Sequence, residues 1–169
     1  MKHLDFVPKA KKTLGSKITL ENGEVLIDGV ASWWTSCHGY NHPDIIKAMQ
    51  KQLNDMPHIM FGGFTHKPAE DLASNLKTLL PSIYNHYFFV DSGSVAVEVS
   101  MKMAIQYWVN KNNKNKRKFL SFKNGYHGDT LGAMSICDPL EGMHSLFKDY
   151  VPEQINTAVS YTHLRAHET

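Results

Sequence analysis

The chain has 169 residues, of which 42% are hydrophobic and 20% charged, and it carries 18 Lys and Arg against 16 Asp and Glu. This composition excludes a disordered chain, and a formal net charge of +2 is too small to indicate a nucleic-acid or anionic-membrane surface. No apolar run approaches the ~18 residues of a membrane-spanning helix, and residues 1–12 lack the apolar core of a signal peptide. We therefore expect a soluble cytoplasmic protein.

The first structural signal is a pair of alternating apolar segments, 17–21 and 24–28, joined by Asn22 and Gly23. Both turn residues tolerate a positive φ, which predicts a tight β-hairpin. The stretch 28–40 follows and is rich in Gly and aromatic residues. It is a poor helix, and it is too interrupted for a single strand.

Two amphipathic helices are expected next. Pro43 stands where a first helical residue is favoured, and apolar residues recur behind it at helical spacing, which predicts a helix over about 42–55 that ends before Pro57. A second helix is predicted to begin near Pro68 and to end at Pro81. A glycine-containing loop lies between them.

The second half of the chain has the pattern of an α/β unit. His86–Val90 is an aromatic and β-branched run typical of a strand buried on both faces, and Val95–Val109 has the composition of a helix that is apolar around most of its circumference. Strand, small-residue turn and helix mark the start of such a unit. The remaining expected elements are a basic connector over 111–118, a strand over 119–122 and a loop over 124–130.

The turn between the predicted strand and helix, residues 91–94, is the best-defined candidate site. The first N–H groups of a helix lack intrahelical partners and carry partial positive charge, which suits a phosphate group. Gly93 permits close approach of a ligand, and the hydroxyls of Ser92 and Ser94 add donors. The same residues also suit plain helix capping, and this alternative stays open. The turn is neither a P-loop nor a dinucleotide fingerprint, so a single phosphate of a small cofactor fits it better.

Two aromatic pairs are further candidates. Tyr126 and His127 lie in the loop after a predicted strand, where ligands of open α/β sheets bind, and Tyr126 could lie against an aromatic cofactor. Trp33 and Trp34 cannot both point the same way in an extended chain, so one is expected in the core and the other at a pocket. A purely structural role is the alternative for each pair.

Other polar clusters carry no function in this interpretation. His38 and His42 lack helical geometry and acidic or cysteine partners, and Cys37 and Cys137 lie far apart, so no metal site is predicted. The basic run over 114–118 joins two regular elements and is interpreted as a solvated connector. No nucleic-acid or membrane partner is expected.

Taken in order, these segments resemble the pyridoxal-phosphate (PLP) aminotransferases of biotin synthesis, the adenosylmethionine-8-amino-7-oxononanoate aminotransferase family, from about Lys17 to Glu153. The hairpin and the Ser-Gly-Ser turn are shared with class-III aminotransferases in general. The segments that carry the resemblance are DG (28–29), SWW (32–34), HGYNHP (38–43), MFGG (60–63), DSGSVAVE (91–98), MKMA (101–104), NGYHGDT (124–130) and MHS (143–145).

The resemblance implies an α/β PLP-dependent transferase of fold type I, present in part: the hairpin and helices of the small domain, then the first strands and helices of the large PLP-binding domain. It implies transfer of the amino group of S-adenosylmethionine to 8-amino-7-oxononanoate, giving 7,8-diaminononanoate. Gly93 and Ser94 would hold the PLP phosphate, Tyr126 would contact the PLP ring or the substrate, and Trp33 would line the substrate pocket. The family's active site lies at a homodimer interface, near which the loop 61–63 is expected.

Three departures from the family pattern are expected to matter. The family's Schiff-base lysine and the aspartate that pairs with the pyridine nitrogen have no counterpart here, so no catalytic residue is assigned and the chain alone is expected to be inactive. Residues 1–16 match only weakly, and residues 156–169 do not continue the family pattern. The predicted organisation is a small-domain segment over 1–65, the start of the large domain over 66–155, and a non-native tail over 156–169. Two alternatives remain: another class-III aminotransferase acting on ω-amino acids or diamines, and a non-catalytic phosphate-binding module.

Overall fold

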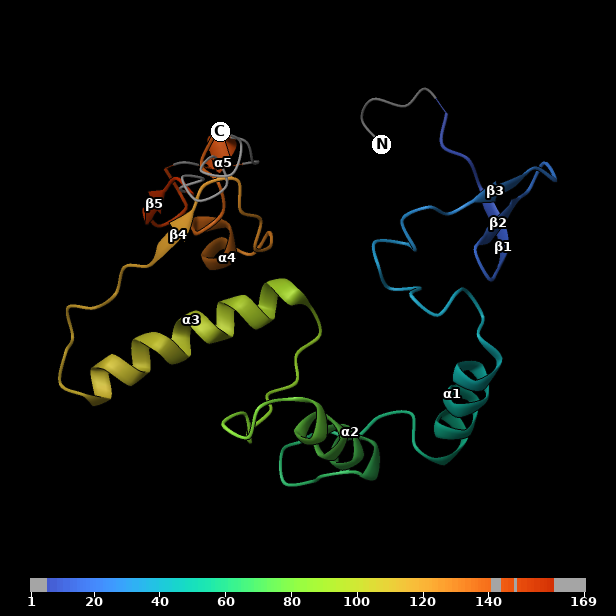
Figure 1. Cartoon of the computed structure of the whole chain (residues 1–169), viewed down its shortest axis with the longest axis horizontal. Coiled ribbons are helices and arrows are strands. Elements are labelled where there is room, and N and C mark those ends of the chain that lie inside the picture. Colours follow the sequence, from blue (N-terminus) through green and yellow to red (C-terminus); the bar gives the residue numbers. More distant parts are fainter. Residues whose placement is uncertain (1–5, 141–143, 148, 160–169) are drawn as a thin grey trace, which may run out of the picture. The chain divides into compact units, whose positions relative to one another are not determined.

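The computed structural model describes residues 6–140, 144–147 and 149–159. Within it the chain divides into two compact units, Met1–Leu79 and Leu80–Thr169. Figure 1 labels the helices and strands of both units. Both helices and strands are present, as the predicted α/β class requires. The division after Leu79 differs from the predicted boundary at residue 65, and the domain assignment itself stays a prediction. Met143 of the MHS segment and residues 160–169 of the expected tail lie outside the described residues. Within the described part, no helix is long and apolar enough to cross a membrane.

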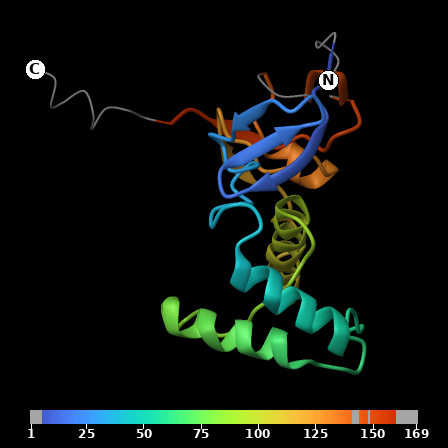
Figure 2. The same cartoon turned by 90° about the vertical axis from the view of Figure 1, so that its right-hand side faces the viewer.

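The first unit opens with an antiparallel sheet of three strands, β1 (Ala10–Leu14), β2 (Lys17–Leu20) and β3 (Val25–Ile27), in that order across the sheet (Figure 2). The predicted hairpin is confirmed as β2 and β3, with Ile18 opposite Leu26. Its loop also includes Glu21, because the N–H of Leu20 donates to the carbonyl of Glu24 at 2.8 Å.

Gly23 has a φ of +90°, whereas Asn22 accepts the N–H of Glu24 on its side-chain oxygen at 3.0 Å. Gly23 thus adopts the positive φ in the turn, and the side chain of Asn22 binds a backbone N–H group of the turn.

Strand β1 has no counterpart among the sequence predictions. Its residues are mostly exposed and lack the alternation of apolar and polar side chains that indicates a half-buried strand. The strand is held by backbone pairing with β2, in which Thr13 lies opposite Ile18, and the register shifts between Ala10 and Lys12. A pattern search misses such an edge strand because its stabilisation lies in the backbone.

Two helices complete the first unit. Helix α1 (Pro43–Asp55) begins with Pro43 as predicted, and its last turn is closed by Met56, whose N–H donates to the carbonyl of Gln52. Helix α2 (Lys67–Leu79) also matches the prediction.

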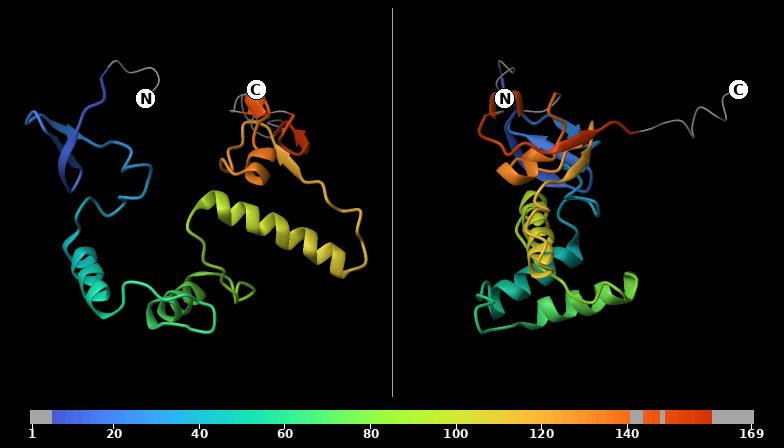
Figure 3. Two further views of the ribbon diagram at one scale, coloured as in Figure 1. Left: turned by 180° about the vertical axis from the view of Figure 1, so that it is seen from behind. Right: turned by 90° about the vertical axis from the view of Figure 1, so that its left-hand side faces the viewer.

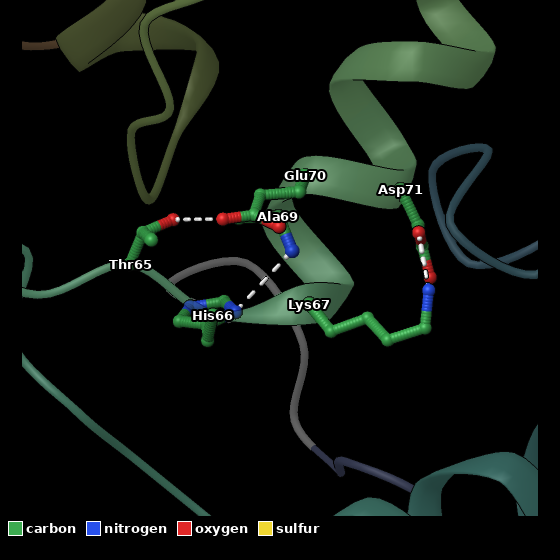
Figure 4. A network of polar contacts seen from close by, with 6 residues as sticks. All are labelled: Thr65, His66, Lys67, Ala69, Glu70 and Asp71. Carbon is green, nitrogen blue, oxygen red and sulfur yellow. Dashed lines mark hydrogen bonds and ion pairs between the residues drawn. The ribbon is translucent and has the colours of Figure 1, made fainter.

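The start of α2 is fastened by polar contacts shown in Figure 4: His66 Nδ1 accepts the N–H of Ala69 at 3.2 Å, and Lys67 pairs with Asp71 at 2.8 Å. The ring of His66 stacks on Phe61 with centroids 5.0 Å apart.

The second unit lacks the strand predicted over His86–Val90. These residues make no sheet pairing in the described part of the chain, and Phe88 and Phe89 are 66% and 41% exposed. This prediction is wrong for the structure because an apolar run favours a strand only where a neighbouring strand takes up its backbone N–H and C=O groups. The apolar run indicates that these residues favour burial, but it does not provide a neighbouring strand with which they could pair.

Helix α3 (Gly93–Asn110) dominates the second unit and confirms the helix predicted over 95–109, beginning two positions earlier (Figure 3). None of its residues is buried, although its composition predicts a largely apolar circumference. The connector that follows is less free than expected, because Lys116 Nζ lies 3.5 Å from the centroid of the Trp108 ring. This cation–π contact fixes part of the basic connector on the helix.

The sheet of the second unit has two parallel strands, β4 (Leu120–Phe122) and β5 (Ile155–Thr157). Strand β4 confirms the prediction over 119–122. The expected start of the tail at Asn156 falls inside β5, where Asn156 Nδ2 donates to Ser121 Oγ at 2.7 Å.

Two short helices, α4 (Leu131–Ser135) and α5 (His144–Phe147), complete the unit. Among the described residues of this unit, Ser121 of β4 is buried, and the other buried side chains lie at and just after α4: Ala133, Met134, Ser135, Cys137 and Asp138.

Candidate functional site

The N-terminal turn of α3 forms as the sequence predicts. Ser92 is the N-cap, with extended backbone and with its Oγ accepting the N–H of Val95 at 3.2 Å. A Cβ placed on Gly93 would meet nothing within 4 Å, so space lies open in front of the first helical residue. An 18-residue helix also presents the positive end of its dipole here. The turn therefore both caps the helix and keeps an open approach for an anion.

The hydroxyl of Ser94 is committed to a different partner. Its Oγ lies 2.8 Å from Thr130 Oγ1, and it accepts the N–H of Thr130 at 2.9 Å. Thr130 donates its only hydroxyl proton to Glu98 Oε2 at 2.7 Å, so Ser94 must be the donor of the hydroxyl pair. The protons thus run from Ser94 to Thr130 to Glu98. Of the two serine hydroxyls in the turn, Ser92 keeps its proton available, while Ser94 can offer its backbone N–H.

The loop over 124–130, which carries Tyr126, is fixed from two sides. Asp138 accepts the N–H of Asn124 at 2.7 Å through its side chain, and its own N–H donates to the carbonyl of Gly125 at 2.9 Å. The buried thiol of Cys137 accepts the N–H of His127 at 3.1 Å. The backbone on both sides of Tyr126 is therefore held by the segment that follows α4.

Tyr126 itself projects from this fixed loop and is 73% exposed. A hydrogen bond with the side chain of Asp129 is the main cause that raises the pKa of Tyr126 above its ordinary value. The phenol thus stays protonated up to a higher pH than a free tyrosine. The loop thus presents an exposed aromatic ring whose hydroxyl group stays protonated.

Trp33 and Trp34 lie in the first unit, on a loop with an unusual backbone. Four successive residues, Ala31 to Trp34, have positive φ values of 49° to 69°, and both indole side chains are 83% exposed. The expectation that one of the pair belongs to the core is therefore wrong for this structure.

The carboxylate of Asp28 holds this loop, because it accepts the hydroxyl of Tyr40 at 2.6 Å and the N–H groups of Val30 and Ser32 at 3.0 and 2.7 Å. Hydrogen bonding lowers the pKa of Asp28, and the hydrogen bond from Tyr40 is the largest cause.

Three of the four predicted site residues lie in the second unit, on two segments that contact each other. Gly93 and Ser94 open α3, and the loop of Tyr126 contacts that helix through Thr130, whereas Trp33 belongs to the other unit. Sequence reasoning assigned no role to Glu98 or Thr130, although both end the quoted segments DSGSVAVE and NGYHGDT. The available signal was spacing, since residues four apart share one face of a helix and Glu98 stands four after Ser94.

The comparisons with known proteins agree with one another on the family of this chain. The model of the class-III aminotransferase family matches residues 2–169. The adenosylmethionine-8-amino-7-oxononanoate aminotransferase of Corynebacterium glutamicum is 49% identical over 144 residues, which cover 85% of this chain and 34% of that protein. The enzyme of the same name from Saccharomyces cerevisiae is 45% identical over 152 residues, covering 86% of this chain and 32% of that protein. The chain thus spans about a third of the length of these relatives.

Solved structures agree with the sequence relatives. The adenosylmethionine-8-amino-7-oxononanoate aminotransferase of Methanocaldococcus jannaschii matches with a TM-score of 0.85 and 30% identity over 93% of this chain and 36% of that one. The ω-transaminase of Pseudomonas jessenii, solved in complex with PMP, matches with a TM-score of 0.81 and 27% identity over 90% of this chain and 34% of that one. The fold is therefore that of the PLP-dependent transaminases, in part, and the chain belongs to the class-III aminotransferase family.

Proposed function

We propose that this chain is part of an aminotransferase of biotin synthesis, which transfers the amino group of S-adenosylmethionine to 8-amino-7-oxononanoate and yields 7,8-diaminononanoate. The observation that carries the proposal is the 49% identity to the Corynebacterium glutamicum enzyme of that name over 85% of this chain. The substrates are proposed from the names of such relatives. The cofactor is proposed from the family and from the site.

The residues present fit PLP. Its phosphate needs N–H and O–H donors and room, and the turn at Ser92 supplies an uncommitted hydroxyl proton, the first N–H groups of α3 and the open space at Gly93. Its ring needs a flat apolar surface, which the exposed Tyr126 offers. When bound, PLP supplies the electron sink on which transamination depends.

The chain's own residues are proposed to bind and orient. Gly93 and Ser94 hold the phosphate by their backbone N–H groups, because the Ser94 hydroxyl proton goes to Thr130. Tyr126 contacts the ring or the substrate and keeps its phenolic proton, since Asp129 raises its pKa. Trp33 is proposed to line the substrate pocket, a role to which its exposure leaves it free.

We also propose that the protein acts in the cytoplasm as a homodimer. Both of its cysteines, Cys37 and Cys137, are free thiols, as expected in a reducing compartment. The loop 61–63 is the proposed border segment, and Phe61 is 55% exposed there although its ring also stacks on His66. Sedimentation of the enzyme with and without a Phe61→Ala substitution would test its part in the dimer.

The proposed reaction can be tested in a chimaera. Residues 17–153 of this chain replace the matching segment of the Corynebacterium glutamicum enzyme, and 7,8-diaminononanoate is measured with S-adenosylmethionine as amino donor. We expect turnover, and we expect the Tyr126→Leu chimaera to lose at least about tenfold in kcat/KM, while the matched Tyr84→Leu chimaera keeps the parent value. A folded, PLP-loaded chimaera without turnover would overturn the proposed substrate pair.

A second candidate is an ω-transaminase, because solved ω-transaminases share this fold with a TM-score of 0.81 at 27% identity. The same chimaera separates the two, since an ω-transaminase segment would favour a simple amine donor over S-adenosylmethionine. The identity to the biotin-pathway relatives is higher, which favours the first candidate.

A further inference from the structure

The carboxylate of Glu98, on α3, accepts hydrogen bonds from a segment outside its own helix. Its Oε2 accepts the hydroxyl of Thr130 at 2.7 Å and the N–H of Ala133 at 2.9 Å, and its Oε1 accepts the N–H of Gly132 at 3.3 Å. Thr130 is the N-cap of α4 but makes no side-chain cap of its own. A carboxylate from α3 therefore caps the helix that follows the Tyr126 loop, as negative charge at a helix start favours.

Two glycines show how closely the segments approach. A Cβ on Gly132 would lie 2.8 Å from Glu98 Cδ, and a Cβ on Gly128 would lie 2.7 Å from Ser94 Cα. Gly128 also has a φ of +127°, which side chains rarely adopt. The end of the Tyr126 loop is thus pressed against the first two turns of α3, with Glu98 as the charged acceptor of that contact.

We propose that Glu98 is a positioning residue, which fixes the loop of Tyr126 relative to the first turn of α3. The inference rests on the proposed function, in which that turn holds a phosphate and Tyr126 contacts the ring of the same molecule. The first turn of α3 and Tyr126 must then stay at a fixed distance from each other, and Glu98 holds the end of the loop that carries Tyr126. The role is indirect, because the carboxylate is already engaged by Thr130 and α4.

The first test measures the contact itself by amide hydrogen exchange in the 169-residue chain. Loss of a hydrogen bond to a charged acceptor corresponds to an exchange rate about 10- to 100-fold higher at Gly132 and Ala133. We expect this in the Glu98→Ala variant and a smaller rise in Glu98→Gln, whose amide oxygen still accepts one bond. The matched control is Ser100→Ala, on the same helix, which should leave both rates unchanged. Unchanged rates in Glu98→Ala would overturn the proposal.

The second test separates positioning from general support of the fold. PLP affinity is measured for the parent, Tyr126→Leu, Glu98→Ala and the double variant. We expect Tyr126→Leu to weaken binding about two- to tenfold in the parent and less than about twofold in the Glu98→Ala background, because the ring is then no longer held in place. Equal losses in both backgrounds would contradict the proposal. A parent that binds no PLP would instead contradict the proposed cofactor site, and the exchange rates would still decide the role of Glu98.

Discussion

At the scale of single residues, Asp28 shows how one carboxylate can hold an unfavourable backbone. A left-handed non-glycine residue costs roughly 1–2 kcal/mol, and four occur in succession from Ala31 to Trp34. The three hydrogen bonds that Asp28 accepts, from Tyr40, Val30 and Ser32, offset part of this cost. The loop that presents Trp33 therefore depends on the charge of a single side chain.

We expect this loop to loosen in acid. Hydrogen bonding lowers the pKa of Asp28, so its contribution to stability is present above the unfolded value near 3.8 and is lost as the pH falls through the lower folded value. In a Trp108→Phe background, the emission of Trp33 and Trp34 should change in this range, and Asp28→Asn should abolish the transition. Asp44→Asn, an exposed carboxylate of α1, is the matched control. An unchanged acid transition in Asp28→Asn would show that another group controls the loop.

The hydrogen bond between Tyr126 and Asp129 is lost at high pH, whereas the contacts of Asp28 are lost at low pH. A hydrogen bond with Asp129 raises the pKa of Tyr126, so the contact is fully present below the ordinary value of 10.0 and is lost as the pH rises through the folded value. We expect Asp129→Asn to lower the pKa of Tyr126, measured by NMR of a ring-labelled tyrosine. Asp149→Asn, the same chemical change elsewhere in the unit, should have no effect. An equal pKa in both variants would exclude Asp129 as the cause.

At the scale of elements, the contact between α3 and the Tyr126 loop is governed by the absence of a side chain at Gly128. We expect Gly128→Ala to destabilise the second unit by about 2–5 kcal/mol, since it adds an unfavourable φ to a steric conflict with Ser94. Denaturant unfolding measures this loss. Gly63→Ala is the control for φ alone, because Gly63 has a φ of +93° and a Cβ there meets nothing within 4 Å. Equal losses at both positions would remove the steric part of the argument.

The sequence predicts those elements whose cause is local. Pro43 at the start of α1 and Gly23 in the hairpin act within a few residues and are found as expected, and Ser92 caps α3, as the alternative of plain helix capping allowed. It fails where the cause is a distant partner, as for β1 and for the strand expected over His86–Val90.

The same distinction between local causes and distant partners applies to the candidate site. Gly93 and Tyr126 are recognisable from their own segments, whereas the acceptor role of Glu98 arises from Thr130 and Ala133, which are 32 and 35 positions away. The spacing of four places Glu98 on the same helix face as Ser94, but it does not identify Thr130 and Ala133 as the partners.

At the scale of the whole molecule, apolar exposure is the leading feature. Among the described residues, the buried hydrophobic side chains are Leu20, Ala133, Met134 and Cys137, while large ones such as Leu79, Ile83 and Leu140 are 77–78% exposed. Exposed large apolar side chains promote association when they gather in patches. The unpaired edges of the two small sheets add a further route to association.

We therefore expect the 169-residue chain to self-associate at micromolar concentrations and to bind a hydrophobic dye in its native state. Light scattering coupled to size exclusion measures the association, and sulfate should increase it because sulfate strengthens apolar burial. A monomer with one cooperative unfolding transition and no dye binding would contradict this expectation.

The parallel pairing of β4 with β5 has a consequence for the time course of folding. Ser121 and Asn156 meet across 35 positions of sequence, and a parallel pair cannot form through a tight turn. The chain must close that long loop before any of the pairing is gained, whereas α3 can form from contacts within its own length. We therefore expect α3 to form before β4 pairs with β5, a pairing that needs the chain through Thr157.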